Sequence, residues 1–507
     1  MQENKRIAVN SIVIFLRLCI TSVVGLLASR LILDALGASD YGLYNVVGGL
    51  VTLLNILNTT MISTTYRFIA YELGKGDSGD SHRVFNASFI IHALLAFLIL
   101  IIGISVGEWY VNNYLNVAAD KIEDAIFVLR VSVITAAIST MMVPHQGLLI
   151  ANEKFTITAL VDIVLALLRL GVIYFFLYLP DNRLRFYSMI MLGYTTLQAL
   201  LFYGYNFIYY RRIVSFAFIK DSALYKKMLS FSLWTLFGGF ANVGKSQGMV
   251  MIINFFYGTI VNAAFAVANN ISRFVTVFAN SLSQAAIPQI TKSFGGGNEG
   301  RSITLTSYIS KYSFLLMSIV AFPVLLETDF LLSVWLKEVP VGASTFCRIV
   351  VLDALLGCLG AGIPALVNAT GDIKWYQIVL YTFIFMGVPL AYLLAKIGFN
   401  QFMIPVVYCF ITVGGAAIKL LFLKYYYKIE IRMIYDISYK CIFKITIPLL
   451  VVFLFYNPSS FSIFGHIMGM VLSEALLMVV IYFLGMNSRE RIMINEMLQS
   501  GIKRIRR

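Results

Sequence analysis

Charged residues are scarce in this sequence of 507 residues. Asp, Glu, Lys and Arg together make up 13% of it, whereas hydrophobic residues make up 59%. Soluble globular chains carry about 25% charged residues, so this chain has too few to cover a water-facing surface. The mean hydropathy of +0.83 agrees with that conclusion. We therefore expect a polytopic membrane protein whose helices use lipid as their solvent.

The sequence is also poor in cysteine and in catalytic motifs. Its five cysteines are odd in number and scattered, which argues against a disulfide framework and gives no metal-ligand spacing. No Walker loop and no nucleophile elbow occur, so direct ATP hydrolysis is not expected. We predict no catalytic residues, no metal, no cofactor and no enzymatic activity.

Acidic residues are fewer than basic ones, which gives a net charge of +14. Nucleic-acid binding is one explanation of such an excess. A better one is the positive-inside rule, by which Lys and Arg gather in cytoplasmic loops. We expect no nucleic-acid partner. The N-terminal "MQENKR" runs directly into a hydrophobic segment without a small-residue cleavage site, so no cleavable signal is expected.

Long apolar runs are what the sequence has in abundance. Runs of about 20 residues separated by short polar loops predict membrane-spanning helices. We predict fourteen, near 10–33, 41–66, 84–110, 124–150, 156–179, 186–210, 228–254, 260–290, 303–326, 342–368, 374–396, 401–424, 438–456 and 462–486. The stretch 327–341 contains several acidic residues and reads as an interfacial segment.

The basic residues predict the orientation of these helices. With the N-terminus in the cytoplasm, 26 of the 39 Lys and Arg fall in cytoplasmic segments and six in external ones. This asymmetry favours a multi-pass protein of the bacterial cytoplasmic (inner) membrane with both termini inside.

Two long basic loops suggest how the chain is divided. They follow the sixth and the twelfth predicted helix. We therefore predict an N-terminal six-helix lobe (1–210), a cytoplasmic basic linker (211–227), a C-terminal six-helix lobe (228–424), two additional helices (425–486) and a basic cytoplasmic tail (487–507). The connecting loops leave no room for a soluble catalytic domain.

A faint repeat at an offset of 221 residues supports two related halves. Gly37 matches Gly258, and "GKGD" at 74–77 matches "GGGN" at 295–298 without a gap. Each copy has an outer turn, one long helix and a glycine-rich inner turn. Both copies begin on the same side, so the repeat is parallel, which is one of the architectures of transporters.

Seven basic residues fall inside the predicted spans. A charge at the middle of a membrane helix costs about 2.5–3.5 kcal/mol, so each should face protein or a watery cavity. Arg17, Lys245 and Arg273 lie deepest and come from both halves, and we predict that they line a cationic, substrate-binding cavity, for which structural ion pairing is the alternative. Asp162, Arg169 and Lys419 are candidates for coupling or for structural ion pairs. Arg130 and Arg348 lie near the outer ends.

The polar stretch "LILDALGASDYGLYNVVGGL" interrupts two apolar runs at residues 31–50. We predict an external hairpin at Gly37 to Asp40, with Gly258 at the equivalent turn of the second half. These turns are candidate gates. For Asp34 and Asp40 the alternative is simply to keep the tip of the hairpin hydrated.

Three pieces of this region carry a family resemblance. They are Arg17 in the first helix, the turn "SRLILDALGASDYGLYNVVGG" and the helix end "YRFIAYELGKGD". Over about the first 80 residues the chain resembles Wzx-type polysaccharide flippases, which belong with MATE multidrug transporters and lipid II flippases to the MOP superfamily. The "GGGN" after the eighth helix looks similar too.

The resemblance implies two six-helix lobes in a V-shaped MATE-like arrangement around a cavity that opens alternately to either side. It also implies a function: translocation of an undecaprenyl-diphosphate-linked oligosaccharide for lipopolysaccharide O-antigen or capsule synthesis, with a polysaccharide polymerase and glycosyltransferases as possible partners. Arg17 matches a family arginine, whereas Lys245 and Arg273 are assigned from charge and depth.

Two other functions fit parts of the sequence. A MATE-type multidrug or cation antiporter should have an acidic cavity, but deep basic residues outnumber deep acidic ones here. A membrane polysaccharide polymerase or glycosyltransferase needs catalytic residues on a sizeable external loop, and the external loops are short. The repeat unit carried and the coupling ion are not legible in the sequence.

Overall fold

The protein is helical throughout the part that the structure describes. The computed structural model covers residues 2–113, 121–176, 182–336, 339–458, 462–488 and 490–492, with the backbone alone at some positions of α1 and α7. Every regular element in these ranges is a helix, and nine of the helices are long and apolar enough to cross a membrane. The predicted all-α, multi-pass class is confirmed.

The chain forms two compact units. Unit 1 comprises Met1–Gly239, Gln284–Glu299 and Asn368–Lys374. Unit 2 comprises Phe240–Ser283, Gly300–Val367 and Trp375–Arg507. The lobe boundaries proposed from the sequence remain predictions.

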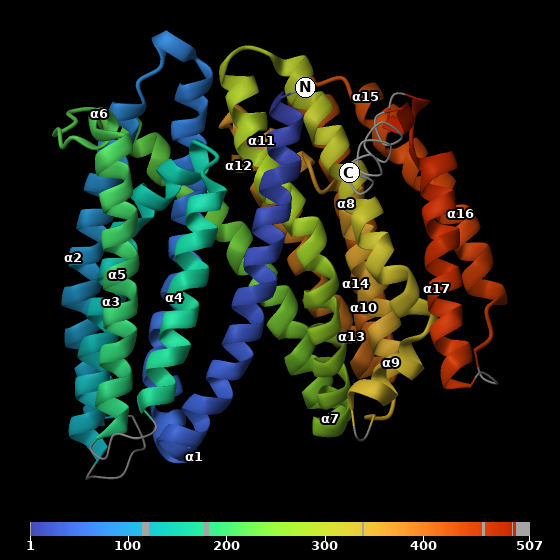
Figure 1. Cartoon of the computed structure of the whole chain (residues 1–507), viewed down its shortest axis with the longest axis horizontal. Coiled ribbons are helices and arrows are strands. Elements are labelled where there is room, and N and C mark those ends of the chain that lie inside the picture. The colour runs from blue at the N-terminus through green and yellow to red at the C-terminus, as the bar shows by residue number, and fades with distance from the viewer. Residues whose placement is uncertain are drawn as a thin grey trace, which may run out of the picture. The chain divides into compact units, whose positions relative to one another are not determined.

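Unit 1 begins with one very long helical element, α1 (Gln2–Gly74). At 1.5 Å per residue its 73 residues would extend about 110 Å if straight, whereas a bilayer core is about 30 Å thick. The ribbon instead turns back on itself at its lower end (Figure 1). The predicted reversal is therefore present, but the backbone stays helical through Gly37 and Asp40 where we predicted a non-helical turn.

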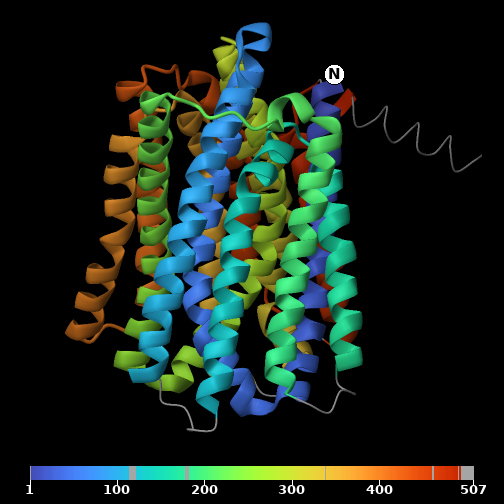
Figure 2. The same ribbon diagram turned by 90° about the vertical axis from the view of Figure 1, so that its left-hand side faces the viewer.

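The remaining helices of unit 1 follow in short steps. They are η1 (Gly76–Ser78), α2 (Ser81–Asn113), α3 (Ile122–Ala151), α4 (Phe155–Phe176), α5 (Arg183–Tyr209) and α6 (Arg211–Val214), and the first part of α7 (Ser222–Gly295) belongs to the same unit. Helix α3 packs against α1, α2 and α5, and α4 against α1 and α5; Figure 2 shows α2 to α5 side by side.

Helix α2 shows how these helices meet the lipid. Leu94 and Phe97 are each 61% exposed, and Ile101 and Ile102 are about half exposed. In water such a row of exposed apolar side chains would be unfavourable, but in a bilayer it faces the hydrocarbon of the lipids. Polar side chains lie on the buried side instead: His92 is fully buried, and its Nδ1 is 2.6 Å from the carbonyl oxygen of Ser88.

Unit 2 is built around the middle of α7, which changes direction at Gly258. Its other elements are α8 (Glu299–Leu326), α9 (Thr328–Trp335), α10 (Ala343–Gly357), η3 (Cys358–Gly360), α11 (Ile363–Thr370), α12 (Lys374–Phe385), α13 (Gly387–Ile397), α14 (Met403–Leu421), η4 (Phe422–Tyr426), α15 (Arg432–Ile434), η5 (Tyr435–Tyr439), α16 (Lys440–Phe455), α17 (Ile463–Val480) and η6 (Ile481–Gly485). Two apolar cores hold it, one around Phe265 and Phe346 and one around Phe314 and Ile445.

The segment 327–371 differs from its prediction. The short helix α9 agrees with a separate interfacial segment, but the single span predicted at 342–368 is broken into α10, η3 and α11. A Cβ at Gly362 would overlap the backbone carbonyl of Thr306 on α8, so the chain approaches α8 too closely there for another residue. Pro364 then occupies the first turn of α11, where a proline is tolerated.

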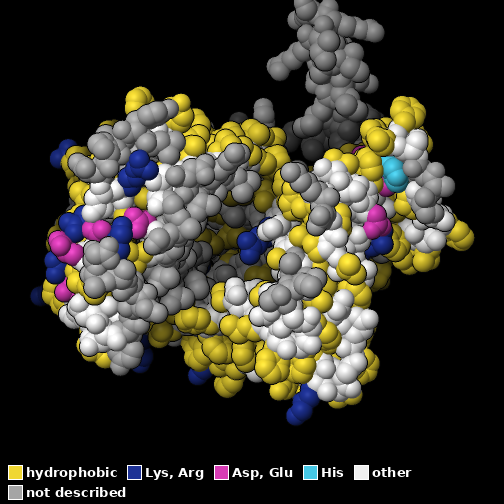
Figure 3. Space-filling view, turned by 90° about the horizontal axis from the view of Figure 1, so that it is seen from below, with side chains coloured by type: hydrophobic (Ala, Val, Ile, Leu, Met, Phe, Trp, Pro, Cys, Tyr) yellow, Lys and Arg dark blue, Asp and Glu magenta, His cyan; other side chains and the backbone are white. Residues whose placement is uncertain are grey.

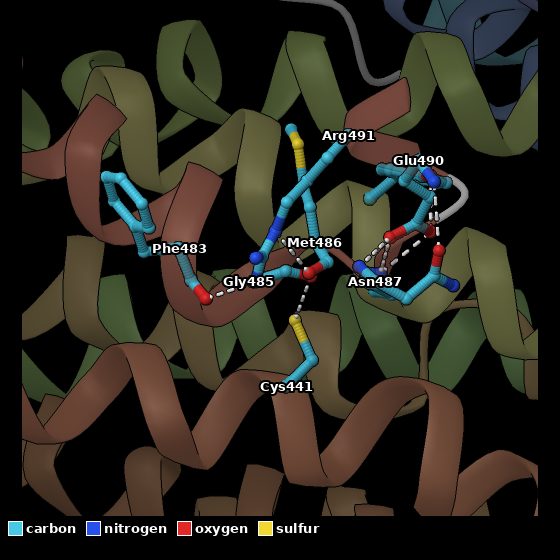
Figure 4. A network of polar contacts seen from close by, with 9 residues as sticks. Cys441, Phe483, Gly485, Met486, Asn487, Glu490 and Arg491 are labelled. Carbon is cyan, nitrogen blue, oxygen red and sulfur yellow. Dashed lines mark hydrogen bonds and ion pairs between the residues drawn. The ribbon is translucent and has the colours of Figure 1, made fainter. Parts of the chain in front are cut away.

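The last helix is tied to α8 by a buried ion pair. Lys311 and Glu490 lie 2.6 Å apart, nitrogen to oxygen, with side chains 4% and 11% exposed, and the Tyr312 hydroxyl donates to the same carboxylate. Arg491 folds back and donates to the carbonyl of Phe483 (Figure 4). The predicted basic tail lies outside the described residues from 493 onward.

Candidate functional site

A polar cluster in unit 1 contains the predicted Arg17. Its guanidinium on α1 is 3.2 Å from a carboxylate oxygen of Asp162 on α4. The other carboxylate oxygen accepts a 2.8 Å hydrogen bond from Gln198 on α5. Both charged side chains are about four-fifths shielded. Three helices therefore meet at a neutralised charge pair, and the participation of Gln198 was not predicted from the sequence.

A second cation lies on the same unit without an acidic partner. Arg169 follows Asp162 by two turns of α4, as predicted, and its guanidinium lies 5.7 Å from the centre of the Tyr194 ring. Its Nε is buried and has no hydrogen-bond partner among the described residues. Since an arginine keeps its charge, these three ionisable side chains of unit 1 carry a net charge of about +1.

Unit 2 holds a similar cluster around the predicted Lys245. Its ammonium on α7 is 3.1 Å from a carboxylate oxygen of Asp353 on α10. The Thr412 hydroxyl on α14 donates to the other oxygen at 2.5 Å, and the ring of Tyr408 lies 4.9 Å from the ammonium. As in unit 1, three helices meet at one ion pair.

Lys419 is the extra cation of unit 2. It lies two turns after Thr412 on α14, and its side chain packs against Gly360. No hydrogen bond or ion pair holds its ammonium within the described part of the chain, and it lies close enough to Lys245 for their charges to interact. Each cluster thus combines one ion pair with one further cation that has no acidic partner in the described part of the chain.

Arg273 does not join this cluster. It lies on α7 beyond the kink, its side chain is exposed, and in the described ranges its guanidinium makes no ion pair. Glu474 on α17 has both carboxylate oxygens buried and without a hydrogen-bond partner among the described residues. The common cavity predicted for Arg17, Lys245 and Arg273 stays a prediction.

The predicted outer turns have different structures. Asp40 is paired with Lys121 at 2.9 Å, and Arg183 donates to the carbonyl of Ala35 at 3.0 Å, so two later segments hold the first turn. The side chain of Asp34 and the surroundings of Gly37 lie outside the described residues. Gly258 has φ 82° and ψ −179°, a conformation essentially restricted to glycine.

Ion pairs also cover the lower end of unit 1. Arg130 pairs with Glu108 at 2.6 Å, and Arg185 pairs with Asp124 at 2.6 Å. Figure 3 shows acidic and basic side chains next to one another on this face. In unit 2, Arg348 pairs with Asp329 at 2.8 Å. The two outer arginines predicted from the sequence are therefore both paired and partly exposed.

The two glycine-rich inner turns touch one another inside unit 1. A Cβ at Gly74 would overlap the backbone carbonyl of Lys292, and a Cβ at Gly295 would overlap that of Tyr71. Gly74 and Gly295 are separated by the 221-residue offset of the repeat, and so are Tyr71 and Lys292. The contact is therefore reciprocal, as in a twofold-symmetric interface.

The same offset relates two left-handed glycines. Gly76 has φ 62° and Gly297 has φ 77°. In the same unit, the buried Arg67 donates to the carbonyls of Asn368 at 2.8 Å and Ala369 at 2.9 Å, which lie in the last turn of α11. An arginine here satisfies carbonyls that a helix end leaves open. Arg67 lies in the family-like motif "YRFIAYELGKGD", but its contacts with these carbonyls were not predicted from the sequence.

No group of three possible metal ligands occurs in the described residues. A cavity of about 560 Å³ in unit 2 lies beside the buried Glu327, whose carboxylate is 2.8 Å from His466 and accepts from the Tyr456 hydroxyl. No local sequence pattern indicated this trio, because Glu327 lies 129 residues from Tyr456 and 139 residues from His466.

No protein-family model matches the chain, and no curated protein matches its sequence. Solved structures do match. One is a MOP superfamily transporter from Pyrococcus furiosus, described as having a binding pocket of reverse polarity that suggests a different function (TM-score 0.69, 16% identity, 83% of this chain and 94% of that one). Another is an outward-facing multidrug resistance MATE family transporter of the MOP superfamily (0.70, 16%, 83% and 94%).

A third is the MATE transporter ClbM in complex with Rb⁺ (TM-score 0.67, 14% identity, 81% of this chain and 92% of that one). Identities this low establish the fold alone. The chain therefore has the fold of MATE-like MOP superfamily transporters, and its cargo has to be argued from its own residues.

Proposed function

We propose that the protein is a transporter that moves an undecaprenyl-diphosphate-linked oligosaccharide across the bacterial cytoplasmic membrane by alternating access. The cargo would serve the synthesis of a surface polysaccharide, lipopolysaccharide O-antigen or capsule. Glycosyltransferases that make it and a polymerase that consumes it are the expected partners.

The observation that carries this proposal is that each of the ion pairs Arg17–Asp162 and Lys245–Asp353 is accompanied by a further cation. Arg17 and Lys245 are matched by one carboxylate each, and Arg169 and Lys419 add charge that none matches among the described residues. In a membrane interior an unmatched cation is costly and marks a functional position. A diphosphate supplies the missing negative charge, and arginine suits phosphate geometry.

A cation or drug antiporter is the second candidate. It is favoured by the fold and by Asp162 and Asp353, which place a carboxylate in each of the two polar clusters. Both carboxylates, however, already hold a cation and a neutral donor. An enzyme is the third candidate, and a purified chain that polymerises or transfers sugars without partners would establish it.

Complementation of a bacterium lacking its own flippase tests the proposal. Arg17→Ala and Arg169→Ala should each abolish surface polysaccharide while immunoblots show normal membrane levels. Arg17→Ala also leaves the Asp162 carboxylate unpaired, so a double variant, Arg17→Ala with Asp162→Asn, removes that complication. We expect the double variant to stay inactive because the cargo still lacks its arginine.

Restored polysaccharide in the double variant would reduce Arg17 to a structural partner of Asp162. Full polysaccharide in both single variants would refute the cationic cargo site. If the chain exports cationic dyes and does not restore surface polysaccharide, the antiporter is favoured instead.

The proposed orientation has its own test. In a cysteine-free background, Ser39→Cys should react with a membrane-impermeant maleimide from outside, because it lies at the predicted external turn. Ser78→Cys, in the exposed η1 turn, should react only after permeabilisation. The opposite pattern would invert the proposed topology.

A further inference from the structure

A polar pocket lies at the end of unit 1 where the chain begins. It has a volume of about 470 Å³ and is lined by residues of α1, the α3–α4 turn, α5 and the last turn of α7. Three of its residues are cations: Arg6, Lys154 and Lys292. None of these residues belongs to the clusters around Arg17 and Lys245.

Two of the cations are not neutralised. Arg6 and Lys154 are exposed, and neither side chain has a hydrogen bond or ion pair in the described part of the chain. Lys292 alone is paired, with Glu153 at 2.8 Å. The pocket therefore presents three positive charges against one negative charge, and the amides of Asn10 and Asn152 add neutral donors.

Glu153 holds an unusual backbone conformation in this pocket. It has φ 59° at the end of α3, where Lys154 N–H bonds the carbonyl of Leu149. Glycine is usual at this position of a helix end, and the left-handed conformation is unfavourable for a residue with a side chain. The conformation directs the carboxylate to Lys292 and to the buried Gln289, which donates at 3.0 Å.

We propose that this pocket binds the phosphate group of an anionic lipid. Arg6, Lys154 and Lys292 hold the phosphate oxygens, and the Glu153 carboxylate competes with them for Lys292. The size and net charge of the pocket suit a phosphate or diphosphate, for which charge-assisted hydrogen bonds are the strongest available. The identity of the lipid as the diphosphate-linked cargo rests on the proposed function, whereas the phosphate site does not.

Calorimetric titration of the purified full chain with inorganic diphosphate tests the site. Lys154→Gln and Arg6→Gln should each weaken binding by about tenfold, since each removes one hydrogen bond from a charged donor. Glu153→Gln should tighten binding because it removes the competing charge. Arg212→Gln, an exposed cation on the predicted same side, is the matched control and should change nothing.

The proposed site would be overturned if all variants bound diphosphate with equal affinity. It would also be overturned if Glu153→Gln bound diphosphate more weakly than the native chain. Vesicles of phosphatidic acid should displace diphosphate, whereas vesicles of phosphatidylcholine should not. If phosphatidic acid fails to displace diphosphate, the ligand is not a lipid and the pocket is a site for free anions.

Two outcomes distinguish a failure of the proposed function from a failure of this site. If Lys154→Gln loses diphosphate binding but restores full surface polysaccharide, the site is not on the path of the cargo, and the flippase proposal stands. If diphosphate binds as predicted but the native chain restores no polysaccharide, the flippase proposal falls and the site remains.

Discussion

Buried charges are arranged alike in the two units at the scale of single residues. In each, a cation on the unit's first long helix meets an aspartate from a second helix and a neutral donor from a third. Breaking such a pair leaves one charge unmatched, which usually costs about 3–5 kcal/mol. Removing both charges is often nearly neutral.

Lys245→Met should therefore destabilise the protein by about 3–5 kcal/mol, because Asp353 would keep only the Thr412 hydroxyl. The double variant, Lys245→Met with Asp353→Leu, should recover most of this loss. Thermal unfolding in detergent, followed by size-exclusion chromatography, measures both. A double variant as unstable as the sum of its single variants would show that the two charges are not coupled.

The sequence singled out Arg17, Lys245 and Asp162 but did not indicate which of them would be partners. Arg17 and Asp162 are 145 residues apart, and Lys245 and Asp353 are 108 apart. Hydropathy locates each charge within its own helix, but no local pattern tells which helices will be neighbours. Glu153 carries no signal at all, because its carboxylate meets Gln289 and Lys292, which lie 136 and 139 residues further along the chain.

At the scale of elements, single glycines decide where long helices change direction. Helical hydrogen bonding is assigned across α7 from Ser222 to Gly295, yet Gly258 departs from helical φ and ψ. Space is not the reason, since a Cβ at Gly258 would meet nothing within 4 Å. The backbone conformation alone requires glycine.

Gly258→Ala should lower stability by about 1–3 kcal/mol, because alanine rarely adopts φ 82° with ψ −179°. Gly25→Ala on α1 is the matched control. It also has open space for a Cβ but a helical backbone, so it should be neutral or stabilising by up to about 1 kcal/mol. Equal midpoints of thermal unfolding for the two variants would contradict this account.

Long helices were predicted well because hydropathy and length are local properties. The break between α10 and α11 was missed because it depends on the approach of Gly362 to Thr306, a contact 56 residues away in sequence. The first outer turn was predicted in place but not in conformation, since small residues permit both a turn and a bent helix.

At the scale of the whole molecule, the repeat that was faint in sequence is evident in one contact. Gly74 meets the backbone at Lys292, and Gly295 meets it at Tyr71. Identity between the halves is low because lipid-facing and packing positions accept many apolar residues. The glycines persist because neither contact leaves room for a side chain.

Gly74→Ala and Gly295→Ala should therefore have similar effects, each costing about 1–3 kcal/mol through overpacking against backbone. The double variant should cost less than the sum, since either substitution already separates the same two segments. Gly300→Ala, with open space at the start of α8, is the control. Thermal unfolding midpoints measure the stability of all four variants. If Gly74→Ala lowers the stability and Gly295→Ala does not, the two contacts are not equivalent.

A reciprocal contact between two halves of one chain behaves like a dimer interface that dilution cannot separate. The intervening chain keeps the effective concentration of one glycine turn near the other high. Such an interface can be small, made of bare backbone and weak by itself, and still re-form each time it parts. Tethering therefore lets a contact of this kind be small without being lost to dilution.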